Sequence, residues 1–62
     1  MLTQKEMQRR AEFQLNVMVW LYKGLKSRDA RSATLGGYET GIYALGSVLG
    51  MEDEEIDTLL EG

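Results

Sequence analysis

The chain has 62 residues and contains neither cysteine nor histidine, which excludes disulfides, thiolate metal sites and the side chain that most often binds transition metals. Its seven Lys and Arg residues are outnumbered by ten Asp and Glu residues, for a net charge of −3. All seven cations lie in residues 1–31 with three acids, whereas residues 32–62 contain seven acids and no cation. The acidic half argues against binding of duplex nucleic acid, while the basic half is suited to phosphates.

A chain of this length is marginally stable as a monomer. Domains of about 60 residues bury only about 60% of the surface that the unfolded chain exposes, and they commonly depend on disulfides, metals or oligomerisation. Disulfides are excluded, and the acidic segment "MEDEEIDTLLEG" (residues 51–62) lacks the alternating ligand order of a calcium loop. We therefore expect a homo-oligomer without a metal or cofactor, in which the two oppositely charged halves can neutralise each other.

The first predicted helix covers residues 3–26. It begins at Thr3, because "TQKE" (residues 3–6) is a capping-box pattern, and no Gly or Pro interrupts it before Gly24. At about 100° per residue its apolar side chains form two stripes. One stripe comprises Met7, Ala11, Leu15, Met18, Tyr22 and Leu25, and the other comprises Phe13, Val17 and Trp20. A single neighbouring helix covers only one of them, so the second is either another buried face or a contact with a subunit or ligand.

Residues 26–33 are polar and predict a loop, and the second helix runs from about residue 31 to residue 49. Gly50 is a natural C-terminal cap for it. Its apolar residues have helical spacing and comprise Tyr38, Ile42, Leu45 and Leu49, with Val48 on the same side.

A short third helix is predicted over residues 53–61. Met51 and Ile56 are placed as a hydrophobic staple around an acidic first turn, which favours the helix dipole. Its single apolar face comprises Ile56, Leu59 and Leu60. With no Pro and no alternating strand pattern, the fold class is all-α: one domain over residues 1–62, a helical hairpin plus a short C-terminal helix, assembled as a homo-oligomeric bundle. No apolar run approaches the ~18 residues of a membrane span and no targeting segment is present, so we expect a cytoplasmic protein.

Four glycines lie inside the second helix, at positions 36, 37, 41 and 46, and each costs roughly 1 kcal/mol relative to alanine. Gly37, Gly41 and Ala44 follow one another at helical spacing, so they form a stripe of small residues. Such a stripe permits either close helix packing or the approach of a ligand to the bare backbone. We predict an oligomer interface made of Phe13, Val17, Trp20, Gly37, Gly41 and Ala44.

The sequence offers no catalytic constellation. The serines have no histidine to activate them, and the paired carboxylates lie in the solvated acidic tail, where nothing separates their pKa values. A DNA-reading helix is also not expected, since the chain has no Arg or Lys after residue 31. We therefore expect a binding protein that is not an enzyme. Arginine and lysine beside tyrosine and tryptophan suit a ligand with phosphates and bases.

The segment "YETGIYALGSVLG" (residues 38–50) resembles the second helix of the helical-hairpin domain in phage nucleotide sponges, the anti-CBASS and anti-Thoeris proteins. The resemblance rests on "GIYAL" followed by "LGSVLG" and, more loosely, on the helix–loop–helix layout of residues 3–50. It implies an oligomer in the cytoplasm of an infected bacterial host that sequesters a cyclic oligonucleotide or a cyclic ADP-ribose derivative without cleaving it. The residues nearest such a ligand would be Arg28, Arg31, Thr34, Tyr38 and Thr40, and the neighbouring basic and aromatic residues Lys26 and Tyr43 join them in the predicted site.

Two functions follow from these observations. The first is a non-catalytic homo-oligomer that sequesters a cyclic nucleotide immune signal. The alternative is a protein–protein interaction module, a phage inhibitor or an assembly adapter, that grips a protein through the face formed by Phe13, Val17 and Trp20.

Overall fold

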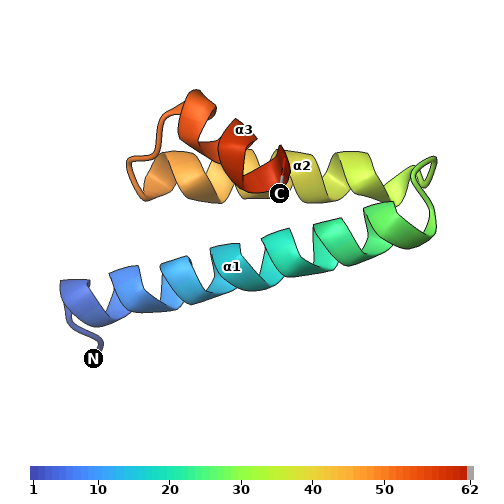
Figure 1. The fold of residues 1–62 in the computed structure, drawn as a ribbon. Helices are drawn as coiled ribbons and strands as arrows, with labels where there is room; N and C mark the ends of the chain where they lie inside the picture. Colours follow the sequence, from blue (N-terminus) through green and yellow to red (C-terminus); the bar gives the residue numbers. More distant parts are fainter. Residues whose placement is uncertain (62) are drawn as a thin grey trace.

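The computed structural model describes residues 1–61, which form three helices and no strand: α1 (Gln4–Arg28), α2 (Thr34–Val48) and α3 (Asp53–Glu61). Figure 1 shows α1 and α2 as an antiparallel hairpin, with α3 folded back along α2. The all-α prediction is confirmed for these residues. The molecule is elongated, with principal extents of 40 × 23 × 17 Å.

The start of α1 is the predicted capping box. The Glu6 backbone N–H donates to Thr3 Oγ1 at 3.1 Å, and the Thr3 backbone N–H donates to Glu6 Oε1 at 3.4 Å. Two N–H groups that would otherwise lack partners are thereby satisfied. The helix continues two residues beyond the predicted end, and it stops where the Asp29 N–H donates to the Leu25 carbonyl at 2.7 Å.

The connection between α1 and α2 is a tight polar turn, and α2 begins at Thr34, later than the predicted residue 31. The Arg31 N–H donates to Asp29 Oδ1 at 3.2 Å, and the Ser32 N–H donates to the Asp29 carbonyl at 3.1 Å. Aspartate side chains commonly close turns in this way, in competition with helix formation. Local hydrogen bonds to Asp29 therefore delay the second helix by about one turn.

Gly50 ends α2 as predicted. Its φ angle is +83°, which places it in the left-handed region that favours glycine. Its N–H donates to the Ser47 carbonyl at 3.0 Å, and the Met51 N–H donates to the Gly46 carbonyl at 2.9 Å. This pair of bonds is a Schellman motif, which satisfies carbonyls at the helix end and redirects the chain.

The third helix occupies the predicted residues. The Glu52 backbone N–H donates to Glu55 Oε1 at 3.1 Å, so a carboxylate accepts a hydrogen bond from a backbone N–H at the start of α3. Met51 and Ile56 lie on either side of this acidic turn, and both approach Gly46 of α2. Ile56 has no exposed surface. The apolar residues at the two ends of the turn therefore fasten α3 to α2.

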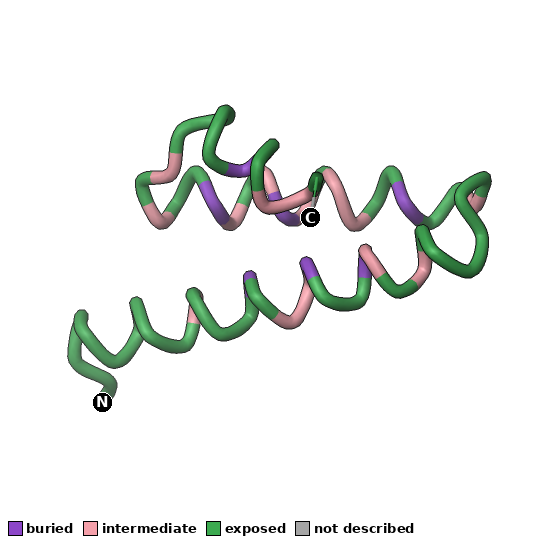
Figure 2. Tube along the Cα trace, viewed as in Figure 1, coloured by how far each residue is buried: buried purple, intermediate pink, exposed green. Residues whose placement is uncertain are grey.

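The core lies where the three helices meet, as Figure 2 shows. Its buried members are Leu15, Val19, Tyr22, Leu35, Ile42 and Ile56, and the partly buried side chains around them include Leu59 and Leu60. The central part of the predicted α1 stripe is confirmed, because Leu15 and Tyr22 are buried and Met18 and Leu25 pack against them. Val19 belongs to the core although neither predicted stripe contains it, since α3 widens the buried side of α1.

Two expectations about apolar side chains are wrong. Met7 is 54% exposed and Val48 is 80% exposed, although both were expected on stripes that pack inside the hairpin. The helices differ in length: α1 has 25 residues and α2 has 15, or about 37 Å against about 22 Å at 1.5 Å per residue. The first turns of α1 therefore extend past α2, and all residues before Ala11 are exposed.

Candidate functional site

The exposed side of α1 is the most prominent aromatic surface of the chain. Phe13 is 64% exposed and Trp20 is 72% exposed, and Val17 lies between them in the helix. At about 100° per residue these side chains point away from Leu15 and Val19, which face the core. The two aromatic rings of the predicted second stripe are therefore exposed and Val17 is half-buried, and we call Phe13, Val17 and Trp20 the outer face of α1.

Cations surround this outer face. Near one end lies an open depression of about 600 Å³ that is lined by Trp20, Leu21, Lys23, Gly24, Ser27 and Arg28. Near the other end lies a depression of about 370 Å³ that is lined by Arg9, Arg10, Phe13 and Gln14. Each aromatic ring thus has two basic residues beside it, so the surface combines apolar area with positive charge.

The hairpin turn brings together three of the predicted ligand residues. Arg28 ends α1, Arg31 lies in the turn, and Thr34 begins α2, and all three are exposed. Lys26 lies about half a turn before Arg28 on α1, with its ammonium 5.7 Å from the ring centroid of Tyr22. The three cations and Thr34 form a loose basic cluster at this end of the hairpin, in which Lys26 and Arg28 point to nearly opposite sides of α1.

The other three predicted ligand residues lie away from this cluster, further along α2. Tyr38 is half-buried and packs against the core. Thr40 donates its hydroxyl to the Gly36 carbonyl at 2.9 Å. The Tyr43 hydroxyl donates to the carboxylate of Asp57 on α3. The seven predicted residues therefore do not surround one pocket within a single chain.

Two tyrosine–carboxylate hydrogen bonds connect the helices, and sequence reasoning missed both. Tyr22 of α1 donates to Glu39 Oε1 of α2 at 2.7 Å. This bond raises the pKa of Tyr22, and burial and the negative charge of Glu39 raise it further. The bond to Asp57, with smaller effects of burial and nearby acids, raises the pKa of Tyr43 to about 12. Both phenols are therefore protonated donors at neutral pH.

The stripe of small residues has more than one role. A Cβ atom added to Gly41 would lie 2.5 Å from Met18 Cε, so this glycine lets α1 approach. Gly37 and Ala44 are exposed, and no atom outside the helix backbone lies within 4 Å of a Cβ added to Gly37. Gly46, which the predicted stripe omits, is where α3 approaches, because its added Cβ would lie 2.7 Å from Ile56 Cδ1.

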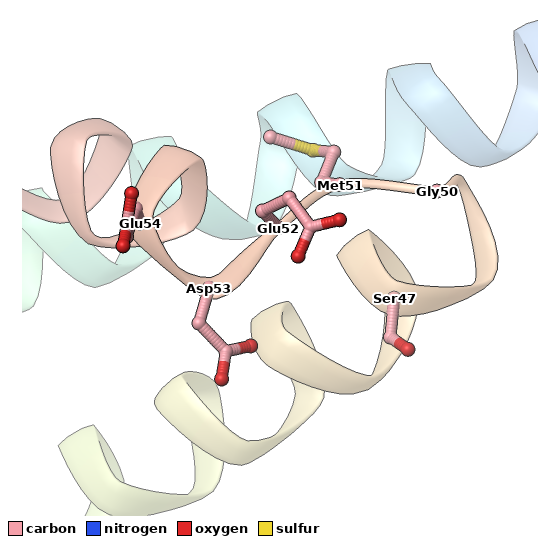
Figure 3. Close-up of a pocket in the computed structure, with 6 residues that line it drawn as sticks. All are labelled: Ser47, Gly50, Met51, Glu52, Asp53 and Glu54. Carbon is pink, nitrogen blue, oxygen red and sulfur yellow. The ribbon is translucent and has the colours of Figure 1, made fainter.

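The connection from α2 to α3 is acidic. Figure 3 shows Glu52, Asp53 and Glu54 around an open depression of about 590 Å³, with Ser47 and Met51 also lining it. Among residues 1–61, no group of three or more acids is arranged to hold a metal ion. The acids instead occupy the start of α3, where negative charge is favourable to the helix dipole.

The helices of residues 1–61 include none that is long and apolar enough to cross a membrane. Comparisons of the chain with protein-family models, with curated proteins and with solved structures give no match. The resemblance to the nucleotide sponges therefore stays a prediction from the residues that carry it.

Proposed function

We propose that the chain is a non-catalytic, homo-oligomeric binding protein of the cytoplasm, and that the outer face of α1 binds a protein with an acid-rimmed apolar groove. The observation that carries this proposal is the exposure of Phe13 (64%) and Trp20 (72%) on a helix whose opposite side packs in the core. Aromatic side chains are common anchors at protein interfaces, and burying one fully contributes about 1.5–3 kcal/mol.

The charges around the anchors define the partner. Arg9 and Arg10 flank Phe13, and Lys23 and Arg28 flank Trp20. A partner with acidic residues around its apolar groove is attracted to this surface, whereas a partner with basic residues there is repelled. The attraction weakens as salt rises, because exposed charges are screened over about 10 Å at 0.1 M ionic strength.

Photocrosslinking tests this proposal. A photoreactive phenylalanine analogue replaces Phe13, and the same analogue at the exposed Gln8, about 140° around α1 from Phe13, is the matched control. We expect one protein to crosslink from position 13 and not from position 8. Trp20→Ala should then raise the dissociation constant of the purified complex with that protein at least about tenfold, or about 1.4 kcal/mol. Added salt should also raise it. Identical crosslinks from both positions, or an affinity unaffected by Trp20→Ala, would overturn the proposal.

A second candidate function is the capture of a cyclic nucleotide, as the resemblance implies. The depression beside Trp20 favours it, because an aromatic ring for base stacking lies with Lys23 and Arg28 there and Arg31 follows in the turn. Base stacking on an aromatic side chain contributes roughly 1–3 kcal/mol.

A capture-and-release assay tests this candidate. The protein is incubated with cyclic dinucleotides, cyclic trinucleotides and cyclic ADP-ribose isomers, and the filtrate and the heat-released fraction are chromatographed. If the protein captures a ligand, one compound should be missing from the filtrate and should be released intact on heating. Arg28→Glu or Arg31→Glu should abolish this binding, whereas Phe13→Ala should retain it. A full panel in the filtrate excludes these ligands and leaves the protein partner as the function to test.

A further inference from the structure

One side of the helical hairpin is covered and the opposite side is not. On the covered side, Ile56 packs on Gly46, Asp57 accepts a hydrogen bond from Tyr43, and the end of α3 reaches Lys23 and Ser27 of α1. The short α3 thus spans both helices on this side. No segment of residues 1–61 packs over the other side, because α3 is the only helix beyond the hairpin in the described chain.

Helical geometry identifies the residues of the open side. At about 100° per residue, Gly41 lies roughly opposite Tyr43 on α2, and Gln14 and Leu21 lie roughly opposite Lys23 on α1. We call this surface the open face. It comprises Met7, Gln14, Met18, Leu21 and Leu25 of α1 and Gly37, Gly41, Ala44 and Val48 of α2. The outer face of α1 adjoins it on that helix, because Gln14 also lines the depression beside Phe13 and Leu21 also lines the depression beside Trp20.

The residues of the open face are uncharged in a chain of which 27% is charged, and Arg10 and Arg28 border it next to Leu21. Met7, Leu21 and Val48 are the large apolar side chains exposed on it, at 54%, 38% and 80%. From Gln14 to Leu25 its residues on α1 follow the alternating spacing of four and three that lines the seam between packed helices. On α2 the exposed Gly37 and Ala44 are small, so a facing helix can approach closely there, whereas Gly41 is already approached by Met18 of the same chain.

The chain exposes more surface than a typical monomer of its mass, and the excess is similar to the area that one partner buries in a dimer interface. A monomer of 7.0 kDa typically exposes about 4,000 Å², whereas this chain exposes 4817 Å². The excess of about 800 Å² equals what one partner buries in an interface of standard size. The radius of gyration is 12.4 Å, whereas a compact chain of this length has a radius of gyration of about 10.6 Å.

The charges at the two ends of the hairpin determine the orientation of a second copy. The turn end carries Lys23, Lys26, Arg28 and Arg31 against Asp29 and Glu61, so it is net positive. The other end combines the four consecutive acids of residues 52–55 with the first turns of α1, where Lys5, Arg9 and Arg10 face Glu6 and Glu12, so it is net negative. Two copies side by side in the same direction place like ends together. Two copies in opposite directions place each basic turn near the acidic connection of the other, which is the attractive arrangement.

We propose that two copies of the chain pair in opposite directions through their open faces and form a four-helix bundle. The two α3 helices then lie on the outside, and the projecting first turns of α1, with Met7, are covered by the other copy. This pairing rests on the homo-oligomeric part of the proposed function. It leaves Phe13 and Trp20 free, so binding of a protein partner and self-association are lost through different variants.

Sedimentation equilibrium over a range of concentrations tests the pairing. Ala44→Lys and Val48→Lys each place a charge in the open face, at positions exposed in the single chain, and Thr58→Lys, at an exposed position of α3 on the outside of the proposed bundle, is the matched control. We expect the unmodified chain to form a dimer. Ala44→Lys and Val48→Lys should each raise its dissociation constant at least about 100-fold, because a buried unpaired charge is costly. The control variant should leave the dissociation constant unchanged. Circular dichroism should show unchanged helix content in all three.

A monomer at all concentrations up to millimolar, or a dimer that survives both substitutions, would overturn the pairing. Trp20→Ala should leave the dimer intact, so loss of the dimer with that variant alone would also contradict the open face. None of these outcomes depends on the protein partner, so the pairing can fail while the proposed partner binding stands.

Charge reversal tests the orientation. The double variant Arg28→Glu/Arg31→Glu and the double variant Glu52→Lys/Glu54→Lys should each weaken the dimer at low salt, because equal charges then meet at both ends. The chain with all four substitutions should recover, since the attraction is restored with reversed sign. A parallel pair predicts no weakening in either double variant, and that result would overturn the opposite orientation.

Discussion

Tyr22 of α1 donates a hydrogen bond to Glu39 of α2 at 2.7 Å, and its ring is buried with only 3% of its surface exposed. Lys26 lies over the same ring, 5.7 Å from its centroid. One tyrosine thus contributes apolar area to the core, a polar link between the two long helices and a contact with a cation. Glu39 is the only charged residue of α2, so this link is the sole strongly polar contact from that helix to α1 within residues 1–61.

Removing the Tyr22 hydroxyl should destabilise the fold. Tyr22→Phe keeps the buried ring but leaves Glu39 without its donor, and hydrogen bonds to charged groups contribute about 1.5–3 kcal/mol. Urea unfolding at one fixed protein concentration measures the change. Tyr38→Phe is the matched control, because its hydroxyl makes no hydrogen bond within residues 1–61, and it should change the free energy of unfolding by less than about 0.5 kcal/mol. Equal effects of the two variants would contradict this role.

Stability should fall at high pH. The pKa of Tyr43 is raised to about 12 from an ordinary value of 10.0, and that of Tyr22 is raised as well. A raised pKa of a phenol means that the folded state holds the proton more tightly, so the contribution is fully present below pH 10 and is lost as the pH rises toward 12. Urea midpoints measured from pH 8 upward should decline through this window. The decline should be smaller in Tyr43→Phe, and a midpoint that is constant in this range would refute the link.

Two glycines of α2 should respond oppositely to alanine. The Cβ of Gly46→Ala would meet Ile56 Cδ1 at 2.7 Å and Cγ1 at 3.0 Å. Ile56 is fully buried and cannot swing away, so we expect a net loss of about 1–3 kcal/mol from overpacking. Gly36→Ala meets no atom outside its own helix backbone within 4 Å and should gain about 0.5–1 kcal/mol of helix stability. Thermal unfolding compares them, and a stabilised Gly46→Ala would show that α3 does not pack as described.

Gly50 should not tolerate a side chain. Its φ of +83° costs a non-glycine residue about 1–2 kcal/mol, although nothing stands within 4 Å of an added Cβ. We therefore expect Gly50→Ala to lower the free energy of unfolding by that amount through backbone strain alone. Gly50→Asn should recover part of the loss, because asparagine adopts this conformation more readily than alanine. Equal stabilities of the two variants would argue against the left-handed cap.

The sequence by itself determined the start of α1, the cap at the end of α2 and the bounds of α3, because these signals act over a few residues. The capping box at Thr3 and the cap at Gly50 are both present as predicted. The start of α2 was placed too early, since the hydrogen bonds that Asp29 makes with the turn compete with a helical turn there. The two stripes of α1 left open whether Phe13 and Trp20 form a second buried face or a contact surface, and both are exposed in the single chain.

Only the tertiary structure decided how the faces of the helices are used. Val19 is buried and Gly46 receives Ile56 because α3 folds back over one side of the hairpin, and periodicity within one helix contains no information on that docking. Tyr43 bonds to Asp57 for the same reason. Met7 is exposed where the longer α1 extends past α2, and Val48 is exposed on the side of the hairpin that α3 does not cover. Local hydrogen bonds depend on neighbouring residues, whereas the packing of helix faces depends on segments that are distant in the chain.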